Sequence, residues 1–340
     1  MSSAGPPGDT MAKPNDNMSA EDRLIARYFA PLATHPGALG LSDDAAFISP
    51  PAGSDLVLTT DAIVGGVHFF TDDAAGKVAQ KALRVNLSDL AAKGAKPLGF
   101  LLSLSLPKET GEDWLAAFAE GLGADAKAYG CPLFGGDSVR TPGPIAMSMT
   151  MFGSVPQGTM VRRAGARPGD RIFVSGTIGD AALGLKLREG AGWKLTDPQR
   201  GHLLSRYLLP QPRTALAEAL RGHASAAMDV SDGLAGDLAK LARVSGVGAT
   251  VTIADMPLSE AAAGIIAADA ALIETVLTGG DDYEIVCAVP PAKTGSFRDA
   301  AKLAQVPITD IGTIAVGEGA RFLNPAGKAL SFENASFSHF

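Results

Sequence analysis

The strongest constraint on the fold is an alternation of short apolar strands and helical segments that runs through the chain twice. A turn-forming segment, Arg167–Asp170, separates the two runs. Alternation of this kind is typical of layered α/β domains, and 340 residues exceed what one ordinary core supports. We therefore predict an α/β protein with two domains, one at residues 19–157 and one at residues 158–340.

The spacing of apolar residues predicts the individual elements. Ser19 and Asp22 form a capping-box pattern at the start of a first helix. Helical spacing and strict alternation distinguish the remaining helices from the strands. The predicted strands are 55–60, 132–134, 145–155, 171–175, 227–230, 249–253, 283–289, 308–314 and 320–323, and the predicted helices include 74–93, 114–129, 179–189, 196–209, 213–221, 233–244 and 296–304.

Composition excludes several classes of protein. Hydrophobic residues make up 46% of the chain and charged residues 19%, which is incompatible with wholesale disorder. The net charge is −7 and no basic stripe occurs, so we expect no nucleic-acid partner. The longest apolar run, Pro97–Pro107, is too short to cross a bilayer, so we expect no membrane span.

The cysteines and the first residues bear on location. Two cysteines, Cys131 and Cys287, cannot form a disulfide framework, and we expect both to be buried in a protein of a reducing compartment, the cytoplasm. Residues 1–18 are rich in Ser, Gly, Pro, Asp and Asn and contain no apolar run. We therefore expect them to be a disordered N-terminus and not a signal peptide.

One motif recurs near the ends of predicted strands, a small or hydroxyl residue followed by aspartate. It occurs five times, at residues 41–44, 59–61, 135–137, 229–232 and 279–282. Small residues let the backbone approach a ligand, and carboxylate and hydroxyl oxygens are the ligands that Mg²⁺ prefers. A single occurrence is more typical of a turn. Five occurrences together favour a magnesium-dependent site.

Asp89 lies within the predicted helix 74–93. At 100° per residue it falls beside the apolar Val78, Ala82 and Val85, and not with the polar residues of the same helix. A carboxylate in an apolar arc is costly unless it is paired or bound to a metal. An ion pair would explain its position, but a metal site fits better with the other aspartates.

Common catalytic motifs are absent from the sequence. There is no P-loop, no protein-kinase set, no G-x-S-x-G elbow and no H-E-x-x-H pair. His68 follows two glycines in a predicted loop and is either a ligand contact or a surface histidine. The pair Arg162-Arg163 either binds a phosphate or is a solvated basic pair.

The motifs resemble, in order and spacing, those of thiamine-monophosphate kinases, from about Ser19 to Phe340. The run Lys81–Ala92 is close to the family pattern over its whole length. The family belongs to the superfamily of aminoimidazole ribonucleotide synthetase. The resemblance implies an N-terminal α/β domain whose sheet pairs across a homodimer, a C-terminal α/β domain, and ATP and Mg²⁺ in the cleft between them.

The reaction that the resemblance implies is the last step of thiamine diphosphate biosynthesis, direct in-line transfer of a phosphoryl group from ATP to thiamine monophosphate. Both reactants are polyanions, and several Mg²⁺ ions offset the repulsion that an acidic, lysine-poor site cannot offset. No residue is implied as a covalent nucleophile. The implied site residues are Asp44, Thr59, Thr60, Asp61, Asp89, Asp137, Asp229 and Asp232 for the metal, Tyr129, Gly136, Asp137, Arg163 and Ser231 for ATP, and His68, Asp281 and Phe337 for thiamine monophosphate.

The chain departs from the family pattern at two places. The family usually has Gly-Gly-Glu-Asp where this chain has Gly279–Asp282, so the side chain of Asp281 is one methylene shorter. Phe337 is the ring expected to cover the thiamine where the family tends to carry Trp or Tyr.

Two alternatives stay open. The first is another ATP-dependent synthetase of the same superfamily, although a selenophosphate synthetase would need a reactive cysteine near the N-terminus and residues 1–20 contain none. The second is a non-catalytic nucleotide-binding regulator. A regulator of this kind would be expected to have lost some of the carboxylates, and all of them are present.

Overall fold

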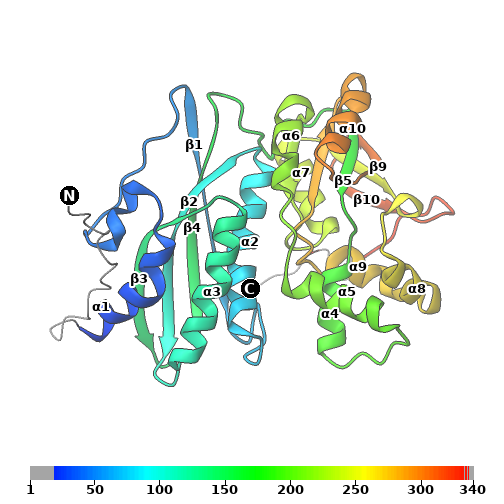
Figure 1. Ribbon diagram of the computed structural model, residues 1–340. Coiled ribbons are helices and arrows are strands. Elements are labelled where there is room, and N and C mark those ends of the chain that lie inside the picture. Colours follow the sequence, from blue (N-terminus) through cyan, green and yellow to red (C-terminus); the bar gives the residue numbers. More distant parts are fainter. Residues whose placement is uncertain (1–18, 333, 335, 337–340) are drawn as a thin grey trace, which may run out of the picture.

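The computed structural model describes residues 19–332, 334 and 336, and it contains two sheets with helices between and around them (Figure 1). The predictions made for residues 1–18 and for Phe337 lie outside the described residues. The predicted α/β class is confirmed. The segment that joins the two sheets runs from residue 157 to residue 170, and the domain boundary at residues 157/158 stays a prediction.

The N-terminal sheet has four strands in the order β1-β4-β2-β3. β4 is antiparallel to both β1 and β2, and β2 is parallel to β3. Helices α2 and α3 cover one face and share its hydrophobic core (Figure 1). The bounds are β1 Ser54–Val64, β2 Lys96–Pro107, β3 Leu133–Thr141, β4 Ala146–Pro156, α2 Ala75–Ala92 and α3 Glu112–Ala128.

Strand β2 was not predicted from the sequence. Its residues Phe100, Leu102 and Leu104 are buried against the helices, whereas Leu101 and Ser103 lie on the opposite face. The strand therefore alternates as expected for a sheet covered on one face. Because Leu101 on the outer face is also apolar, the run looks continuous in the sequence and its period of two is hidden.

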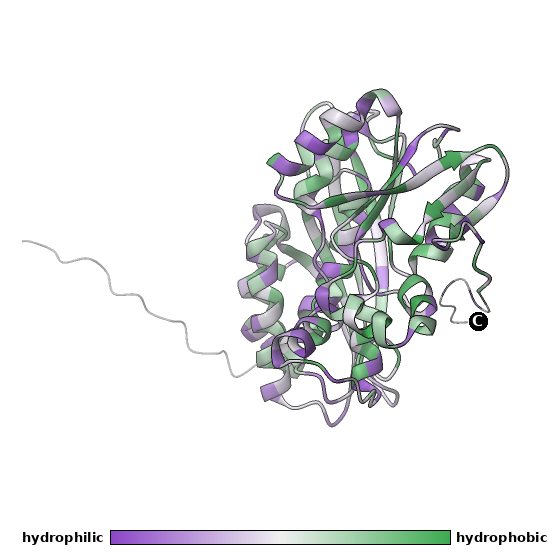
Figure 2. Ribbon diagram, turned by 90° about the vertical axis from the view of Figure 1, so that its right-hand side faces the viewer, coloured by the Kyte–Doolittle hydropathy of each residue, from purple (hydrophilic) through white to green (hydrophobic). Residues whose placement is uncertain are grey.

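The C-terminal sheet has six strands in the order β10-β7-β9-β5-β8-β6. Short helices surround it, and in Figure 2 hydrophobic and hydrophilic residues alternate along the helices that border the surface, as helices with one buried face require. The strands are β5 Arg171–Ser175, β6 Ala226–Asp229, β7 Gly248–Thr252, β8 Ile285–Val289, β9 Ile308–Ala315 and β10 Gly319–Leu323. The helices are α4 Asp180–Arg188, α5 Asp197–Leu208, α6 Ala217–His223, α7 Leu234–Ser245, α8 Glu260–Ala268, α9 Ile273–Thr278 and α10 Thr294–Leu303.

Strand β8 begins two residues later than predicted. Tyr283 was assigned to this strand, but its φ is 49°, a left-handed value that does not fit an extended strand. The preceding loop therefore continues through Tyr283, and its shape matters for the site described below.

Helix α2 lies between the two halves of the molecule (Figure 1). It contacts β1 and β4 on one side and β6, α5 and α6 on the other. The helix therefore buries polar residues as well as apolar ones, and Lys81 and Ser88 are only 2% and 0% exposed. Both are directed at the C-terminal half, since Lys81 donates to the Asp281 carboxylate and Ser88 to the carbonyl of Tyr283.

The first described segment consists of α1 (Ala20–Leu24) and three short helical turns, η1 (Ile25–Phe29), η2 (Ala30–Leu32) and η3 (Pro36–Leu41). It lies beside the N-terminal sheet, where η1 contacts α3 and η3 contacts β3. The predicted capping box is confirmed, since Ser19 Oγ accepts from the Asp22 amide at 3.0 Å and the Asp22 carboxylate accepts from the Ser19 amide at 3.1 Å. Across the described part of the chain, no helix is both long enough and apolar enough to span a membrane.

Candidate active site

Strand β1 and helix α2 bring the first group of predicted metal ligands together. Thr59 and Asp61 are two residues apart on β1 and so share one face of the sheet. Thr59 donates its hydroxyl to the carboxylate of Asp89 on α2. The amide of Asp61 donates to Asn86 Oδ1 at 3.0 Å, one turn before Asp89 on the same helix. Asn86 therefore fixes β1 against α2, which places Asp61 near Asp89.

The loop after β6 adds two more carboxylates from the C-terminal half. Asp229 ends β6 and is 6% exposed. The next turn is shaped by Asp237, whose Oδ2 accepts from the amides of Ser231 and Asp232 at 3.0 and 2.9 Å. Lys240 then bridges Asp232 and Asp237 at 2.5 and 2.9 Å. Helix α7 thus fixes the shape of the loop that carries Asp232.

The carboxylates of Asp61 and Asp89 in the N-terminal half interact electrostatically with those of Asp229 and Asp232 in the C-terminal half. The pKa of Asp61 is raised to about 6, first because surrounding protein atoms reduce its solvation and then because Asp89 and Asp232 are nearby negative charges. The pKa of Asp229 is raised well above its ordinary value by burial and next by the charge of Asp89. We call Asp61, Asp89, Asp229 and Asp232 the cleft carboxylates.

Few cations balance the cleft carboxylates. Lys93, the residue after α2, donates to the carbonyl of Ala227 at 2.9 Å and feels both Asp229 and Asp89, and burial lowers its pKa. The charge of Arg163 also lowers the pKa of Lys93, so this predicted ATP residue lies at the edge of the same group while its side chain is exposed. Lys240 is engaged by Asp232 and Asp237. Negative charge at the cleft therefore remains in excess.

The donor set at the cleft fits Mg²⁺. It offers carboxylate oxygens and the hydroxyl of Thr59, which are hard ligands. Among residues 19–332, 334 and 336, no three His, Cys, Asp or Glu side chains already form a group that could hold a metal ion. Mg²⁺ is usually bound by one or two carboxylates, with water and substrate phosphates completing its six ligands. An incomplete protein cage is therefore compatible with this ion.

A cavity of about 640 Å³ lies on the other face of the N-terminal sheet. The first described segment covers it from one side, and β2, β3 and β4 line it from the other. It brings together three further predicted residues, Asp44, Gly136 and Asp137. The apolar part of its lining includes Phe47, Phe134 and Phe152.

The strand register separates this cavity from the cleft carboxylates. Asp61 pairs with Met149, Met149 with Leu102, and Leu102 with Gly136. Asp61 and Asp137 are therefore about three strand spacings apart, or roughly 14 Å. Thr60 also lies on the cavity side, because its hydroxyl is 3.3 Å from the hydroxyls of Ser148 and Thr150. The predicted metal ligands thus form two groups on opposite faces of the sheet.

Gly136 has a packing role that the sequence did not indicate. A Cβ atom on this residue would lie 1.9 Å from the backbone oxygen of Leu102 on the adjacent strand. Such a contact is impossible, so glycine is required by the close approach of β2 to β3. A contact of Gly136 with ATP stays a prediction.

The predicted contacts of thiamine monophosphate meet on the other side of α2. The loop Gly279–Tyr283 has left-handed φ values of 75° at Gly280 and 63° at Asp281. The Asp281 amide donates to the carbonyl of Ser231 at 2.8 Å, so this loop is fastened to the loop after β6. Lys81 of α2 donates to the Asp281 carboxylate at 2.7 Å and to the carbonyl of His68 at 2.9 Å.

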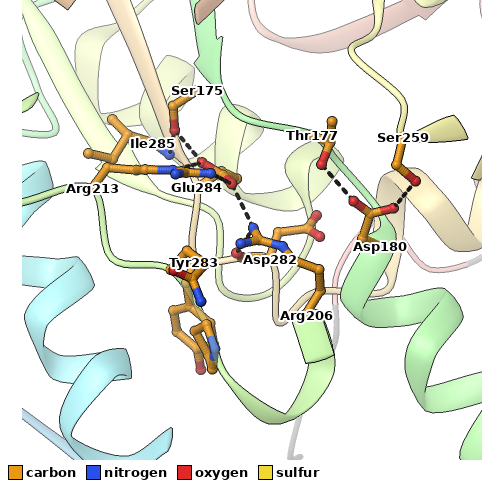
Figure 3. Close-up of polar contacts among 12 residues, drawn as sticks. Ser175, Thr177, Asp180, Arg206, Arg213, Ser259, Asp282, Tyr283, Glu284 and Ile285 are labelled. Carbon is orange, nitrogen blue, oxygen red and sulfur yellow. Dashed lines mark hydrogen bonds and ion pairs between the residues drawn. The ribbon is translucent and has the colours of Figure 1, made fainter. Parts of the chain in front are cut away.

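A buried polar network supports this loop from behind (Figure 3). Glu284 is 0% exposed and accepts from Arg206 at 2.6 Å, from Arg213 at 2.5 and 2.6 Å and from Ser175 at 2.6 Å. Asp282 accepts from the Gly179 amide at 2.9 Å, and burial raises its pKa well above the ordinary value. Farther along, Asp180 accepts from Thr177, Ser259 and His202.

One predicted ATP-binding residue, Tyr129, lies beside an arginine of α2. Tyr129 follows α3, and the guanidinium of Arg84 lies 5.9 Å from the centre of its ring. Residues that the sequence analysis missed include Asn86, Asp237, Lys240 and Glu284. The three-residue spacing of Asp237 and Lys240 on a helix directly after the aspartate motif was the available signal for this pair. Asn86 and Glu284 act through long-range contacts that spacing does not show.

Comparison with known proteins identifies the family. Residues 42–155 match the AIR synthase related protein N-terminal domain, and residues 167–323 match the corresponding C-terminal domain. The thiamine-monophosphate kinase of Caulobacter vibrioides is 44% identical over 315 residues, which cover 92% of this chain and 88% of that protein. The chain belongs to the thiamine-monophosphate kinase family.

Two solved members of the thiamine-monophosphate kinase family have the same fold. The enzyme from Stenotrophomonas maltophilia is 40% identical with a TM-score of 0.80, over 91% of this chain and 96% of that chain. AaThiL, complexed with AMPPCP and TMP, is 32% identical with a TM-score of 0.74, over 88% of this chain and 91% of that chain. The family resemblance inferred from the motifs is confirmed.

Proposed function

We propose that this protein transfers a phosphoryl group from ATP to thiamine monophosphate in the cleft beside α2, forming ADP and thiamine diphosphate. The observation that carries the proposal is the group of cleft carboxylates, which come from both halves of the molecule and exceed the cations around them. The names of the relatives and the ligands of the AaThiL complex support it.

Mg²⁺, when bound, would neutralise the phosphates and orient them for in-line displacement. We propose that Asp61, Asp89, Asp229 and Asp232 hold it, with the hydroxyl of Thr59. The chain supplies position and not a nucleophile, because thiamine monophosphate itself carries the attacking oxygen. Asp44, Thr60 and Asp137 lie on the opposite face, and their assignment to the metal stays a prediction.

The remaining residues would hold the two reactants on either side of the metal. Ser231 lies in the loop between Asp229 and Asp232, and Arg163 lies at the exposed edge, so both can approach the nucleotide. His68 and Asp281 lie together at Lys81 and are proposed to bind thiamine monophosphate. The shorter Asp281 occurs where the family usually has glutamate, and its left-handed backbone is fixed by the Ser231 carbonyl.

The test is a product assay on the purified protein with ATP and thiamine monophosphate. We expect ADP and thiamine diphosphate in equal amounts with Mg²⁺, no turnover with a chelator, and recovery when Mg²⁺ is restored. Full turnover in metal-free buffer would contradict the metal assignment. A protein that binds ATP without forming thiamine diphosphate would support the alternative of a synthetase or a regulator.

We also propose a homodimer through the N-terminal sheet. The face of this sheet away from α2 exposes apolar residues, including Leu58 at 64% and Leu56 at 41% on β1 and Val139 at 47% on β3. Exposed apolar patches on a sheet of this kind are typical of association surfaces. Light scattering at micromolar protein should give the mass of a dimer, and a monomer would contradict this proposal.

A further inference from the structure

The ammonium group of Lys81 is buried between the two halves of the molecule. Its side chain is 2% exposed, and packing alone would favour an apolar residue at this position. It donates to the carbonyl of His68 at 2.9 Å and to the carboxylate of Asp281 at 2.7 Å, and it lies 4.1 Å from the ring centre of Tyr207. A buried charge is tolerated only when it is paired and hydrogen-bonded, and Lys81 meets both conditions.

The three partners come from three separate segments. His68 lies in the loop after β1, Tyr207 lies on α5, and Asp281 lies in the loop before β8. His68 and Asp281 are the described residues that the family resemblance assigns to thiamine monophosphate. The Lys81 ammonium therefore contacts the backbone of one predicted substrate residue and the side chain of the other.

Contacts among the neighbouring residues shield Lys81 from solvent. Phe70 packs edge-on against Tyr207 at 6.0 Å, and the guanidinium of Arg188 lies 4.5 Å from the centre of the Phe70 ring. Arg188 also pairs with Asp73 at 2.8 Å, which fixes the loop that contains His68 to α4. The Lys81 ammonium is thus covered by protein, while Asp281 stays 30% exposed.

We propose that Lys81 is a positioning residue for the acceptor, which fixes Asp281 and the His68 loop in one geometry without touching thiamine monophosphate itself. This inference rests on the proposed function, and it gives a role to a lysine that belongs to a family motif but is not among the site residues that the resemblance implies. Its chemical basis is that one oxygen of Asp281 is bound to Lys81, so the direction of the carboxylate is set before the substrate arrives. A preorganised carboxylate binds a cationic or amino-substituted ring with less loss of conformational freedom.

The test compares Lys81→Met with the unmodified protein and with Lys77→Met, an exposed lysine one turn earlier on α2. We expect Lys81→Met to raise the KM for thiamine monophosphate about ten- to a hundred-fold, as for the loss of hydrogen bonds to a charged group. The KM for ATP should change by less than about two-fold, because the nucleotide is held elsewhere. Calorimetric titration with thiamine monophosphate alone should show the same loss of affinity, and Lys77→Met should match the unmodified protein.

A second comparison separates positioning from direct contact. In an Asp281→Asn background, Lys81→Met should raise the KM for thiamine monophosphate by a clearly smaller factor than in the unmodified protein, because the contact with the Asp281 carboxylate is already altered and only the contact with the His68 carbonyl is left to lose. Effects that multiply would show that Lys81 contacts the substrate and would overturn the positioning role. If Lys81→Met does not fold, Lys81→Gln keeps a donor at the same depth and should raise the same KM several-fold.

Several outcomes would overturn the inference. A folded Lys81→Met or Lys81→Gln protein with an unchanged KM for thiamine monophosphate would show a purely structural ion pair. An equal rise in the KM for thiamine monophosphate and the KM for ATP would show that Lys81 stabilises the packing of the two halves and does not act on the acceptor site in particular. Inactivity of the unmodified protein would overturn the proposed function and this inference together, whereas an active unmodified protein with a normal Lys81 variant would overturn this inference alone.

Discussion

Two acidic clusters lie close together in this molecule, and they differ in how their charge is compensated. Glu284, Asp282 and Asp180 in the C-terminal half are fully or almost fully buried, and protein donors satisfy them. Among the cleft carboxylates, Asp61 and Asp232 are more open and Asp229 is buried, and the pKa values of Asp61 and Asp229 are raised first by burial and then by neighbouring carboxylates. The first cluster holds a loop in shape, whereas the second is the one that we propose to receive a cation.

The difference shows that acidity alone does not identify a metal site. Glu284 has two arginines and a serine around it, so an added cation would have nothing to neutralise. The pKa of Asp61 is instead raised, first by burial and then by two other carboxylates, Asp89 and Asp232. Compensation by neighbouring donors is therefore the property that separates a structural carboxylate from a candidate ligand.

The largest expected effect is the loss of activity in Asp89→Asn. The change keeps the size of the side chain and removes one charge that we assign to Mg²⁺. Turnover should fall by about a thousand-fold or more, since loss of a metal ion removes several kcal/mol of transition-state stabilisation at about 1.4 kcal/mol per tenfold. The melting temperature should change little or rise, because a like-charge repulsion is relieved. A destabilised but fully active variant would contradict the assignment of Asp89 to the site. The matched control is Asp299→Asn, a change at an exposed aspartate of α10.

The same type of change at Glu284 should have the opposite profile. Glu284→Gln leaves the guanidinium groups of Arg206 and Arg213 without their buried counter-charge. The free energy of unfolding should fall by about 3–5 kcal/mol, as for the breaking of a buried ion pair. Denaturant titration beside the unmodified protein measures this. A stability within error of the unmodified protein would show that the network is not a structural support.

Binding of Mg²⁺ should stabilise the protein by an intermediate amount. At about a hundred times its dissociation constant, a ligand that binds only the folded state adds about 2.7 kcal/mol. Thermal unfolding with and without Mg²⁺ should show this gain in the unmodified protein and a much smaller gain in Asp61→Asn. An equal gain in both would place the ion outside the cleft carboxylates.

The smallest expected effect is a pH dependence of stability from Asp61 in metal-free buffer. Its pKa in the folded protein is about 6, above its ordinary value of 3.8, so the folded state holds this proton more tightly than the unfolded state. Stability should therefore fall as the pH rises from about 4 to about 6, by less than about 1 kcal/mol because part of the residue is still reached by solvent, which screens its interactions. Asp61→Asn should lack this component of the slope, and Mg²⁺ should suppress it. A stability that rises through this range because of Asp61 would contradict the sign.

The sequence by itself determined the class of fold and the family, and it predicted which residues could offer oxygen ligands to a metal. Local patterns were sufficient for these, because strand alternation, helical spacing and the strand-end aspartates are encoded within a few neighbouring residues. The sequence failed where the period was hidden, as in β2, and where backbone conformation overrode the pattern, as at Tyr283.

Only the tertiary structure decided which of these residues meet. It divided the predicted metal ligands between two faces of one sheet, because Thr60 and Asp61 are adjacent in sequence and a strand points successive side chains in opposite directions. It also placed Lys81 between His68 and Asp281, 13 and 200 residues away along the chain. Contacts between residues that are far apart in the sequence depend on how sheets and helices pack, and a local sequence pattern does not predict that packing.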